Sequence, residues 1–350
     1  MRTARLLLCS LILLLPFPAA ADLIIIPHFD STITSNADAS QIESTIDSAL
    51  NVYESEFATN ITVNIYFQTF DSNCDCLGES DVGRVYEVPY QTFYDQLTTI
   101  DANPAAIASL NANGGDGNTN GGVDPVLGKS DVVVKSANAR ALGFTAAALC
   151  YVTAGDTTPA SDVPNHCGSS GSAGSLVDGI ISLNTFITSP PNSLSGFYSL
   201  ESTVEHEVDE VLGLGSSLPN TSASSGTVTN SFVAPEDLWR YSPSGQRVFS
   251  VNCAAPGTAV FSVNGTGQGQ GFNNSCNGAD FGDWAGGGSA QVQDAYATPG
   301  ANPTLGTNEA AALTAVGYQL AVPEPATFGL LFSSLGLAAV LGRRNRGGSR

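Results

Sequence analysis

Two apolar segments, one at each end of the chain, limit the part of the sequence that can form a folded core. Residues 1–21 combine Arg2 and Arg5 with an apolar run and a small-residue end, a pattern that predicts a secretory signal peptide cleaved near Ala21. Residues 326–341 form a second apolar run, short for a stable membrane span and followed by arginines that should remain cytoplasmic. We therefore expect transient membrane anchorage by the C-terminal segment and a folded body between the two segments.

The body, assigned to residues 22–321, carries far more acidic than basic side chains. Residues 22–325 contain 6 basic and 32 acidic residues, which gives a net charge of −26. A surface of that sign repels phosphate backbones and argues against nucleic acid as a partner. It suits a soluble exported protein, and one that can hold cations.

The tail, residues 322–350, has a three-part order. Pro323, Glu324 and Pro325 stand before the apolar run, and an arginine cluster follows it. This order resembles the PEP-CTERM sorting signal of exopolysaccharide-producing Gram-negative bacteria. The resemblance implies export across the inner membrane by the Sec translocon and signal peptidase, processing by an exosortase, and a final place at the cell surface or in the extracellular matrix. A plain tail anchor is the alternative.

Six cysteines remain after the signal peptide, and an even number in an exported chain predicts disulfides. Six cysteines allow 15 pairings, of which we favour the local pairs Cys150–Cys167 and Cys253–Cys276. Cys74 and Cys76 could instead bind a metal as thiolates, although an oxidising compartment argues against that.

The hydrophobic pattern predicts one α+β unit. Residues 22–29 and 61–68 are expected to be strands that flank a long helix over 38–57, which makes a crossover unit. Past residue 216 the sequence becomes β- and glycine-rich. The other expected elements are helices at 90–100, 104–110 and 308–316, strands at 143–152, 179–183, 249–251 and 259–263, and loops at 112–125 and 162–175.

The loop at 112–125 echoes the start of a calcium-binding loop. Asp116, Asn118, Asn120 and Asp124 have suitable spacing, but Leu127 stands where the loop needs a glutamate. A plain flexible loop is the favoured interpretation, and a calcium site is the alternative.

One helix carries the residues best suited to chemistry. Apolar residues at helical spacing over 203–212 predict a helix with one buried stripe, ended by Gly213. His206 and Glu210 are one turn apart on the same face, where they could hold one zinc ion. Glu207 is placed to accept a proton from a metal-activated water, as in H-E-x-x-H helices.

This helix resembles the metzincin signature His-Glu-x-x-His-x-x-Gly-x-x-His. The chain keeps His206, Glu207 and Gly213, but has Glu210 at the second histidine and Ser216 at the third. More broadly, the body resembles a bacterial family of predicted PEP-CTERM metalloproteases, with matching segments at 178–184, 236–242, 282–284 and 315–318. The resemblance implies a metzincin-like N-terminal lobe of long helices on a twisted sheet, with an edge-like strand at 179–184.

The third metal ligand stays open at the level of sequence. Ser216 is a poor zinc ligand, and the candidates are Tyr241, Asp237, Glu236 and His166, with Tyr241 attractive because metzincin-like sites sometimes recruit a tyrosine. We interpret the Gly-Asp-Trp segment at 282–284 as a turn with a buried tryptophan.

The sequence thus predicts an exported zinc-dependent metallopeptidase that hydrolyses peptide bonds in a protein or peptide substrate. The alternative is a non-catalytic surface or exopolysaccharide-matrix protein on the same scaffold, and a third hypothesis is a calcium-stabilised adhesion module. A third ligand near His206 and Glu210 would favour the enzyme, whereas an apolar or blocked cleft would favour the non-catalytic protein.

Overall fold

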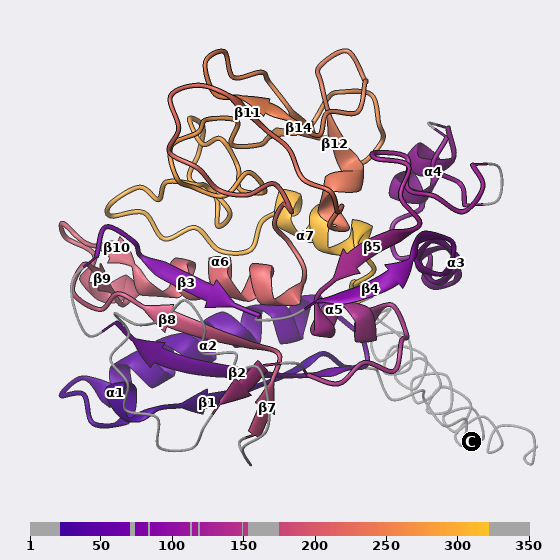
Figure 1. The fold of residues 1–350 in the computed structure, drawn as a ribbon. Helices are drawn as coiled ribbons and strands as arrows, with labels where there is room; N and C mark the ends of the chain where they lie inside the picture. The colour runs from indigo at the N-terminus through magenta and orange to yellow at the C-terminus, as the bar shows by residue number, and fades with distance from the viewer. Residues whose placement is uncertain are drawn as a thin grey trace, which may run out of the picture. The chain divides into compact units, whose positions relative to one another are not determined.

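A four-stranded sheet organises the N-terminal part of the protein (Figure 1). The structure is a computed structural model and describes residues 22–70, 74–82, 85–112, 114–117, 120–148, 150–152 and 175–321. The strand order is β1 (Ile24–Phe29), β2 (Thr62–Thr69), β8 (Gly179–Leu183) and β3 (Gly78–Asp81). The first three strands are parallel and β3 runs antiparallel at the edge.

The expected crossover unit is confirmed. β1 and β2 pair in parallel, with Ile25 opposite Val63, and the helix α2 (Ala39–Glu56) connects them. The sequence was wrong about the edge strand, because β8 lies inside the sheet and all five of its residues are buried. Its continuous apolar run is typical of a strand covered on both faces. The edge position belongs to the short, polar β3.

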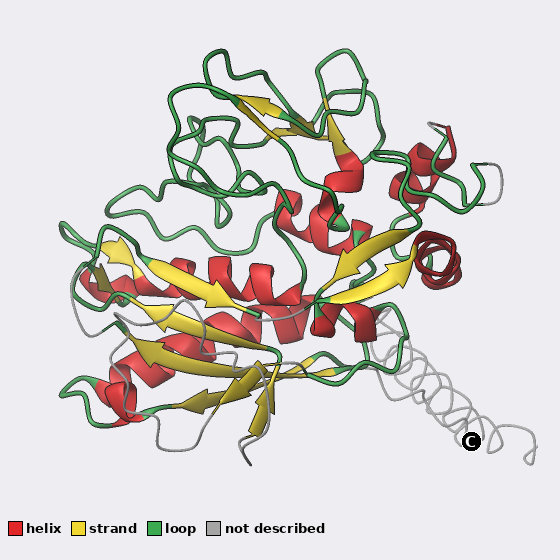
Figure 2. Ribbon diagram, in the orientation of Figure 1, coloured by secondary structure: helices red, strands yellow, loops and turns green. Residues whose placement is uncertain are grey.

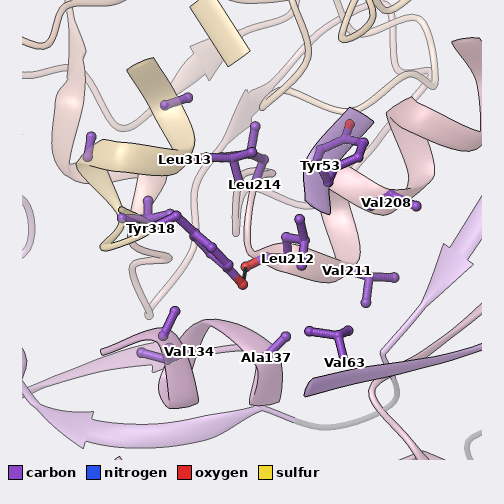
Figure 3. Packing of buried hydrophobic residues seen from close by; sticks show 14 of the residues in the cluster. Tyr53, Val63, Val134, Ala137, Val208, Val211, Leu212, Leu214, Leu313 and Tyr318 are labelled. Carbon is purple, nitrogen blue, oxygen red and sulfur yellow. Dashed lines mark hydrogen bonds between the residues drawn. The ribbon is translucent and has the colours of Figure 1, made fainter. Parts of the chain in front are cut away.

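Two helices cover the sheet and pack against each other. The stripe of α2 that includes Ile42, Ile46, Ala49 and Leu50 is buried. The second helix, α6 (Leu200–Leu212), packs against α2, β3 and β8. Figure 3 shows the side chains of this contact, among them Tyr53 of α2.

The central part of the chain contributes small elements around this core. α1 (Ser31–Thr34) follows β1; β4 (Tyr86–Pro89) pairs with β5 (Asp131–Val134), and β6 (Cys150–Val152) pairs with β7 (Ser175–Val177). The helices α3 (Tyr90–Ile100) and α4 (Pro104–Ala112) confirm the predictions for these segments, and α5 (Ser136–Ala141) follows β5.

The strand expected at 143–152 forms only at its end, as β6. Residues 144–148 have no regular structure, and the side chain of Arg140 donates to the carbonyl of Ala146 at 3.2 Å. That carbonyl is held by a side chain and not by a neighbouring strand. The loop expected at 162–175 lies mostly outside the described residues.

The C-terminal part is made mainly of loops that join very short strands (Figure 2). These strands are β9 (Thr188–Ser189), β10 (Tyr198–Ser199), β11 (Thr227–Val228), β12 (Arg240–Tyr241), β13 (Val251–Asn252), β14 (Val260–Phe261) and β15 (Gln270–Gly271). Two 3-10 turns, η2 (Pro191–Ser193) and η3 (Glu236–Trp239), and the last helix α7 (Thr307–Ala315) complete the fold. The α+β class is confirmed, but the C-terminal part is rich in loops and not in β-structure, since each of its strands has only two residues.

Buried aromatic residues form the core of the C-terminal part. The rings of Phe261, Phe272 and Trp284 contact one another, with the centroids of Phe272 and Trp284 5.4 Å apart. The buried guanidinium of Arg240 lies 4.6 Å from the centroid of the Phe272 ring and donates to the carbonyl of Phe281. This arrangement combines a cation–π contact with hydrogen bonds in place of water.

Two disulfides are present in the described residues. Cys253–Cys276 confirms one of the favoured pairs. Cys74 and Cys76 are bonded to each other, so they are not available as thiolate ligands. The expected Cys150–Cys167 pair cannot be placed, since Cys167 lies outside the described residues.

The loop with the calcium-like spacing is held by Asp124. One carboxylate oxygen of this buried residue accepts from the backbone N–H groups of Val126 and Leu127, and the other accepts from that of Lys129. Asn118 lies outside the described residues, so the calcium alternative stays a prediction.

Within the described part of the chain, no helix has the length and hydropathy needed to cross a membrane. The two apolar segments at the chain ends lie outside that part.

The close approach of β8 to α6 generates a prediction about stability. A Cβ atom at Gly179 would lie 2.6 Å from Cγ2 of Val211, a β-branched side chain with little freedom to move. We expect Gly179→Ala to lower the free energy of unfolding by about 1–3 kcal/mol, measured by denaturant titration. Gly288→Ala is the control, because that glycine is exposed and no atom lies within 4 Å of its added Cβ.

The double variant Gly179→Ala/Val211→Ala tests the cause. If the overlap with Val211 is responsible, the double variant costs less than the sum of the two single changes. Strictly additive costs would contradict this explanation.

Candidate metal centre

Helix α6 fixes the positions of the residues that the sequence singled out. It begins after Ser199, whose Oγ accepts from the backbone N–H of Ser202, and ends at Gly213, which has a φ of 135°. A positive φ of this kind is accessible to glycine and strained for other residues. The predicted helix and its end at Gly213 are therefore confirmed.

A third residue joins His206 and Glu210. Nε2 of His206 lies 3.8 Å from Oε1 of Glu210 and 3.7 Å from Oδ1 of Asp283. The three ligand atoms all lie within 4.8 Å of one another. Tetrahedral zinc with bonds of about 2.1 Å separates its ligand atoms by about 3.4 Å. The two distances from Nε2 of His206 exceed this separation by only a few tenths of an ångström.

Each of these side chains is oriented by a neighbour. Nδ1 of His206 lies 2.9 Å from the carbonyl oxygen of Val292, which requires the proton on Nδ1 and leaves the lone pair of Nε2 facing the carboxylates. Ser80 of β3 donates to Oε2 of Glu210 at 2.5 Å, so that Oε1 of Glu210 is the oxygen near His206. Oδ1 of Asp283 is buried and accepts no hydrogen bond in the described structure. An acceptor left in this state fits a position beside a cation.

The segment that carries Asp283 is anchored on both sides. A Cβ atom at Gly282 would overlap the backbone of Gly215 and Ser216, so only glycine allows this close approach. The buried Trp284 donates from Nε1 to Oε1 of Glu309 at 2.9 Å. The buried tryptophan expected at 282–284 is confirmed, whereas Asp283 was not among the ligand candidates named from the sequence.

Three of the ligand candidates named from the sequence, Tyr241, Glu236 and Asp237, do not line the cleft around His206. Tyr241 is fully buried in β12, with the guanidinium of Arg247 4.9 Å from its ring centroid. Glu236 accepts from the backbone N–H of Gly215 at 2.6 Å, and Asp237 accepts from the hydroxyl groups of two serines, Ser216 and Ser217. His166 lies outside the described residues.

Glu207 lies against the edge strand. It is 5% exposed, and a Cβ atom at Gly78 of β3 would come within 2.6 Å of its Oε1. Burial raises the pKa of Glu207 well above its usual value, the negative charge of Glu210 raises it further, and His206 opposes the shift. A nearby cation would favour the ionised form of this carboxyl group.

The site opens into a polar cleft of about 880 Å³. Its lining comes mainly from residues 75–80, from α6 and from loop residues between 277 and 303. Among the described residues the lining holds no lysine or arginine, and its acidic residues are Asp75, Glu79, Glu207, Glu210, Asp280, Asp283 and Asp294. In the described part of the chain the cleft is open and has both polar and apolar surface.

Comparison with known proteins identifies the tail and nothing else. A family model described as the PEP-CTERM protein-sorting motif matches residues 321–346, which include Pro323, Glu324 and Pro325. No curated protein and no solved structure matches the chain. The motif implies an exosortase as the processing partner and indicates export to the cell surface or matrix. The metzincin resemblance has no support from these matches and stays a prediction.

The acidic residues beside the site predict how stability depends on pH. Burial raises the pKa of Glu236 to about 8, against about 4.3 for an unfolded chain. A carboxyl group with a raised folded-state pKa stabilises the fold below its unfolded pKa, and the contribution is lost as the pH rises through the folded value. We therefore expect the melting temperature to fall between pH 5 and pH 8.5.

Glu236→Gln removes this titration. Thermal melts of the two proteins over the same pH range should show a shallower dependence for the variant. Part of the dependence should remain, because burial also raises the pKa of Glu205 to about 7. Parallel curves for the two proteins would show that Glu236 does not contribute.

Proposed function

We propose that this protein is an exported zinc-dependent metallopeptidase in which His206, Glu210 and Asp283 hold the zinc. The observation that carries the proposal is the buried, unsatisfied Oδ1 of Asp283, 3.7 Å from the histidine nitrogen that faces the cleft. The imidazole ligand favours zinc over calcium, which takes oxygen ligands. Export through the Sec translocon and release after tail processing complete the proposal.

When bound, zinc supplies a water with a pKa lowered to about 7 and polarises the carbonyl of the scissile peptide bond. Two carboxylate ligands place more negative charge around the ion than the two histidines of an H-E-x-x-H site. We therefore expect a weaker Lewis acid and a greater share of the work for the proton-transfer residue.

Glu207 is that residue in our proposal. It follows His206 directly on α6, lines the same cleft and is nearly excluded from solvent. Its carboxylate accepts one proton from the attacking water and returns it to the amine that leaves when the peptide bond breaks. His206 keeps its Nδ1 proton throughout, because the carbonyl of Val292 holds it.

The edge strand offers a way to bind an extended peptide. Among the described strands, β3 is the last of its sheet and pairs with β8, and residues 78–80 line the cleft beside Glu207. Unpaired backbone groups on an edge strand can hydrogen-bond a substrate chain as an additional strand. The absence of a side chain at Gly78 lets the carboxyl group of Glu207 lie directly against this strand.

The proposed ligands His206, Glu210 and Asp283 generate a prediction about zinc content. We expect the protein to bind about one zinc ion and Asp283→Asn to lose most of it, since an amide is a poor zinc ligand. Elemental analysis after dialysis measures the content. Tyr241→Phe is the control, because its side chain lies outside the cleft lining and the variant should retain zinc. Unchanged zinc in Asp283→Asn, or loss in Tyr241→Phe, would contradict the assignment.

The proposed role of Glu207 in proton transfer generates a prediction about turnover. Glu207→Gln keeps the size of the side chain and removes the base, so zinc should remain while turnover falls by about 10²–10⁴-fold. Glu210→Gln should instead weaken zinc binding. Assays would use denatured casein and a quenched peptide library. Equal cleavage by wild type and Glu207→Gln would refute the mechanism, and no cleavage by the zinc-loaded wild type would favour the non-catalytic matrix protein.

A further inference from the structure

We infer that the cleft selects peptides carrying a lysine or arginine side chain, and that Asp294 binds that side chain. The inference rests on the proposed peptidase function of the same cleft, and it adds a substrate class to it.

Asp294 stands next to the candidate metal centre. Trp284 and Asp294 form a parallel β-bridge, with the backbone N–H of Ala295 donating to the carbonyl of Trp284 at 3.0 Å. Since Asp283 directly precedes Trp284, the bridge brings Asp294 beside the proposed zinc ligand. Both aspartates line the cleft.

Within the described residues, only one of the two carboxylate oxygens of Asp294 accepts a hydrogen bond. Oδ2 accepts from the backbone N–H of Gln291 at 3.0 Å. Oδ1 is buried and accepts no hydrogen bond among the described residues, and 8% of the surface of Asp294 as a whole is exposed. A buried carboxylate oxygen without a donor is costly unless a ligand supplies one.

The charge of the cleft points to a cationic donor. Zinc would compensate Glu210 and Asp283, and Glu207 serves in proton transfer. The remaining acids are Asp75 and Glu79, both exposed, together with Asp280 and Asp294. The described lining holds no lysine or arginine, so the negative potential of these carboxylates is not offset within it. This potential attracts a cationic group that enters the cleft, and the low dielectric of the cleft strengthens the attraction.

Lys135, a described lysine close to the site, already has partners elsewhere. Its Nζ donates to the carbonyl oxygens of Glu210 and Leu214, outside the lining of the cleft. Among the described residues no side-chain cation lines the cleft, and a ligand can take that place.

The wall around Asp294 suits a long basic side chain better than a small cation. Val292, Ala295 and Ala297 offer apolar surface to the methylene stem, which lysine and arginine bury while their charged ends stay paired. Tyr296, 59% exposed, presents an aromatic ring on the same segment, and such a ring can take a guanidinium or ammonium group.

The test compares two peptides that differ only in lysine or norleucine at one position near the scissile bond. We expect the zinc-loaded wild type to show a kcat/KM at least about tenfold higher for the lysine peptide, and Asp294→Asn to bring the ratio close to one. Asp47→Asn, at an exposed position on α2, is the matched control and should keep the wild-type ratio.

Binding of the same fluorescent peptides to Glu207→Gln separates this inference from the proposed function. If the protein binds the lysine peptide selectively but the wild type does not cleave it, the proposed peptidase function is wrong and the binding site for a basic side chain is supported. Cleavage with equal kcat/KM for both peptides would overturn the inference and leave the peptidase. A lysine preference that survives in Asp294→Asn, or a second zinc ion lost in that variant, would overturn the assignment of Asp294.

Discussion

The packing of helix α6 against the sheet and against α2 is the contact on which the rest of the structure depends. Val208, Val211 and Leu212 fill the space between these elements (Figure 3). Gly179 allows the helix to approach β8 closely. The hydroxyl group of Tyr53 donates to the carbonyl of Glu205, and that of Tyr318 donates to the carbonyl of Leu212 near the end of the helix. Because one side of α6 is fixed in this way, His206, Glu207 and Glu210 on its other side line the cleft. The buried helix therefore fixes the positions of these three residues more precisely than a loop would.

The C-terminal part completes what the helix begins. The described strands of this part are short, and most of it is loop. Backbone hydrogen bonds and contacts between buried aromatic residues nevertheless hold Val292, Asp283 and Asp294 around His206. The resulting group of carboxylates is unfavourable by itself, because burial and mutual repulsion raise the pKa of Asp283 well above its usual value. A bound cation removes this penalty. The same part of the protein thus supplies the third candidate ligand and the proposed contact for a substrate cation.

The sequence predicted what depends on local pattern and missed what depends on distant contacts. Hydrophobic spacing was sufficient for α2, β2 and α6, and the H-E-x-x-E spacing was sufficient for His206, Glu207 and Glu210. The inner position of β8 depends on its pairing with a segment about 100 residues earlier in the chain, which periodicity does not report. Asp283 lies more than 70 residues after the helix, so no local pattern links it to His206. Its position depends on the contacts that hold Gly282 and Trp284 on either side of it, and these contacts are visible only in the structure. Tyr241 was attractive by resemblance, but β12 buries it away from the cleft lining.

The central claim is that Asp283 completes a zinc site with His206 and Glu210. A crystal structure of the zinc-loaded protein, with anomalous scattering recorded on both sides of the zinc absorption edge, tests it most directly. The account predicts one strong peak about 2.0–2.2 Å from Nε2 of His206 and from a carboxylate oxygen of each acid. A peak bonded to Tyr241, or a peak that leaves Asp283 outside bonding distance, would contradict it. So would zinc-soaked crystals in which His206 only forms ion pairs with the two carboxylates.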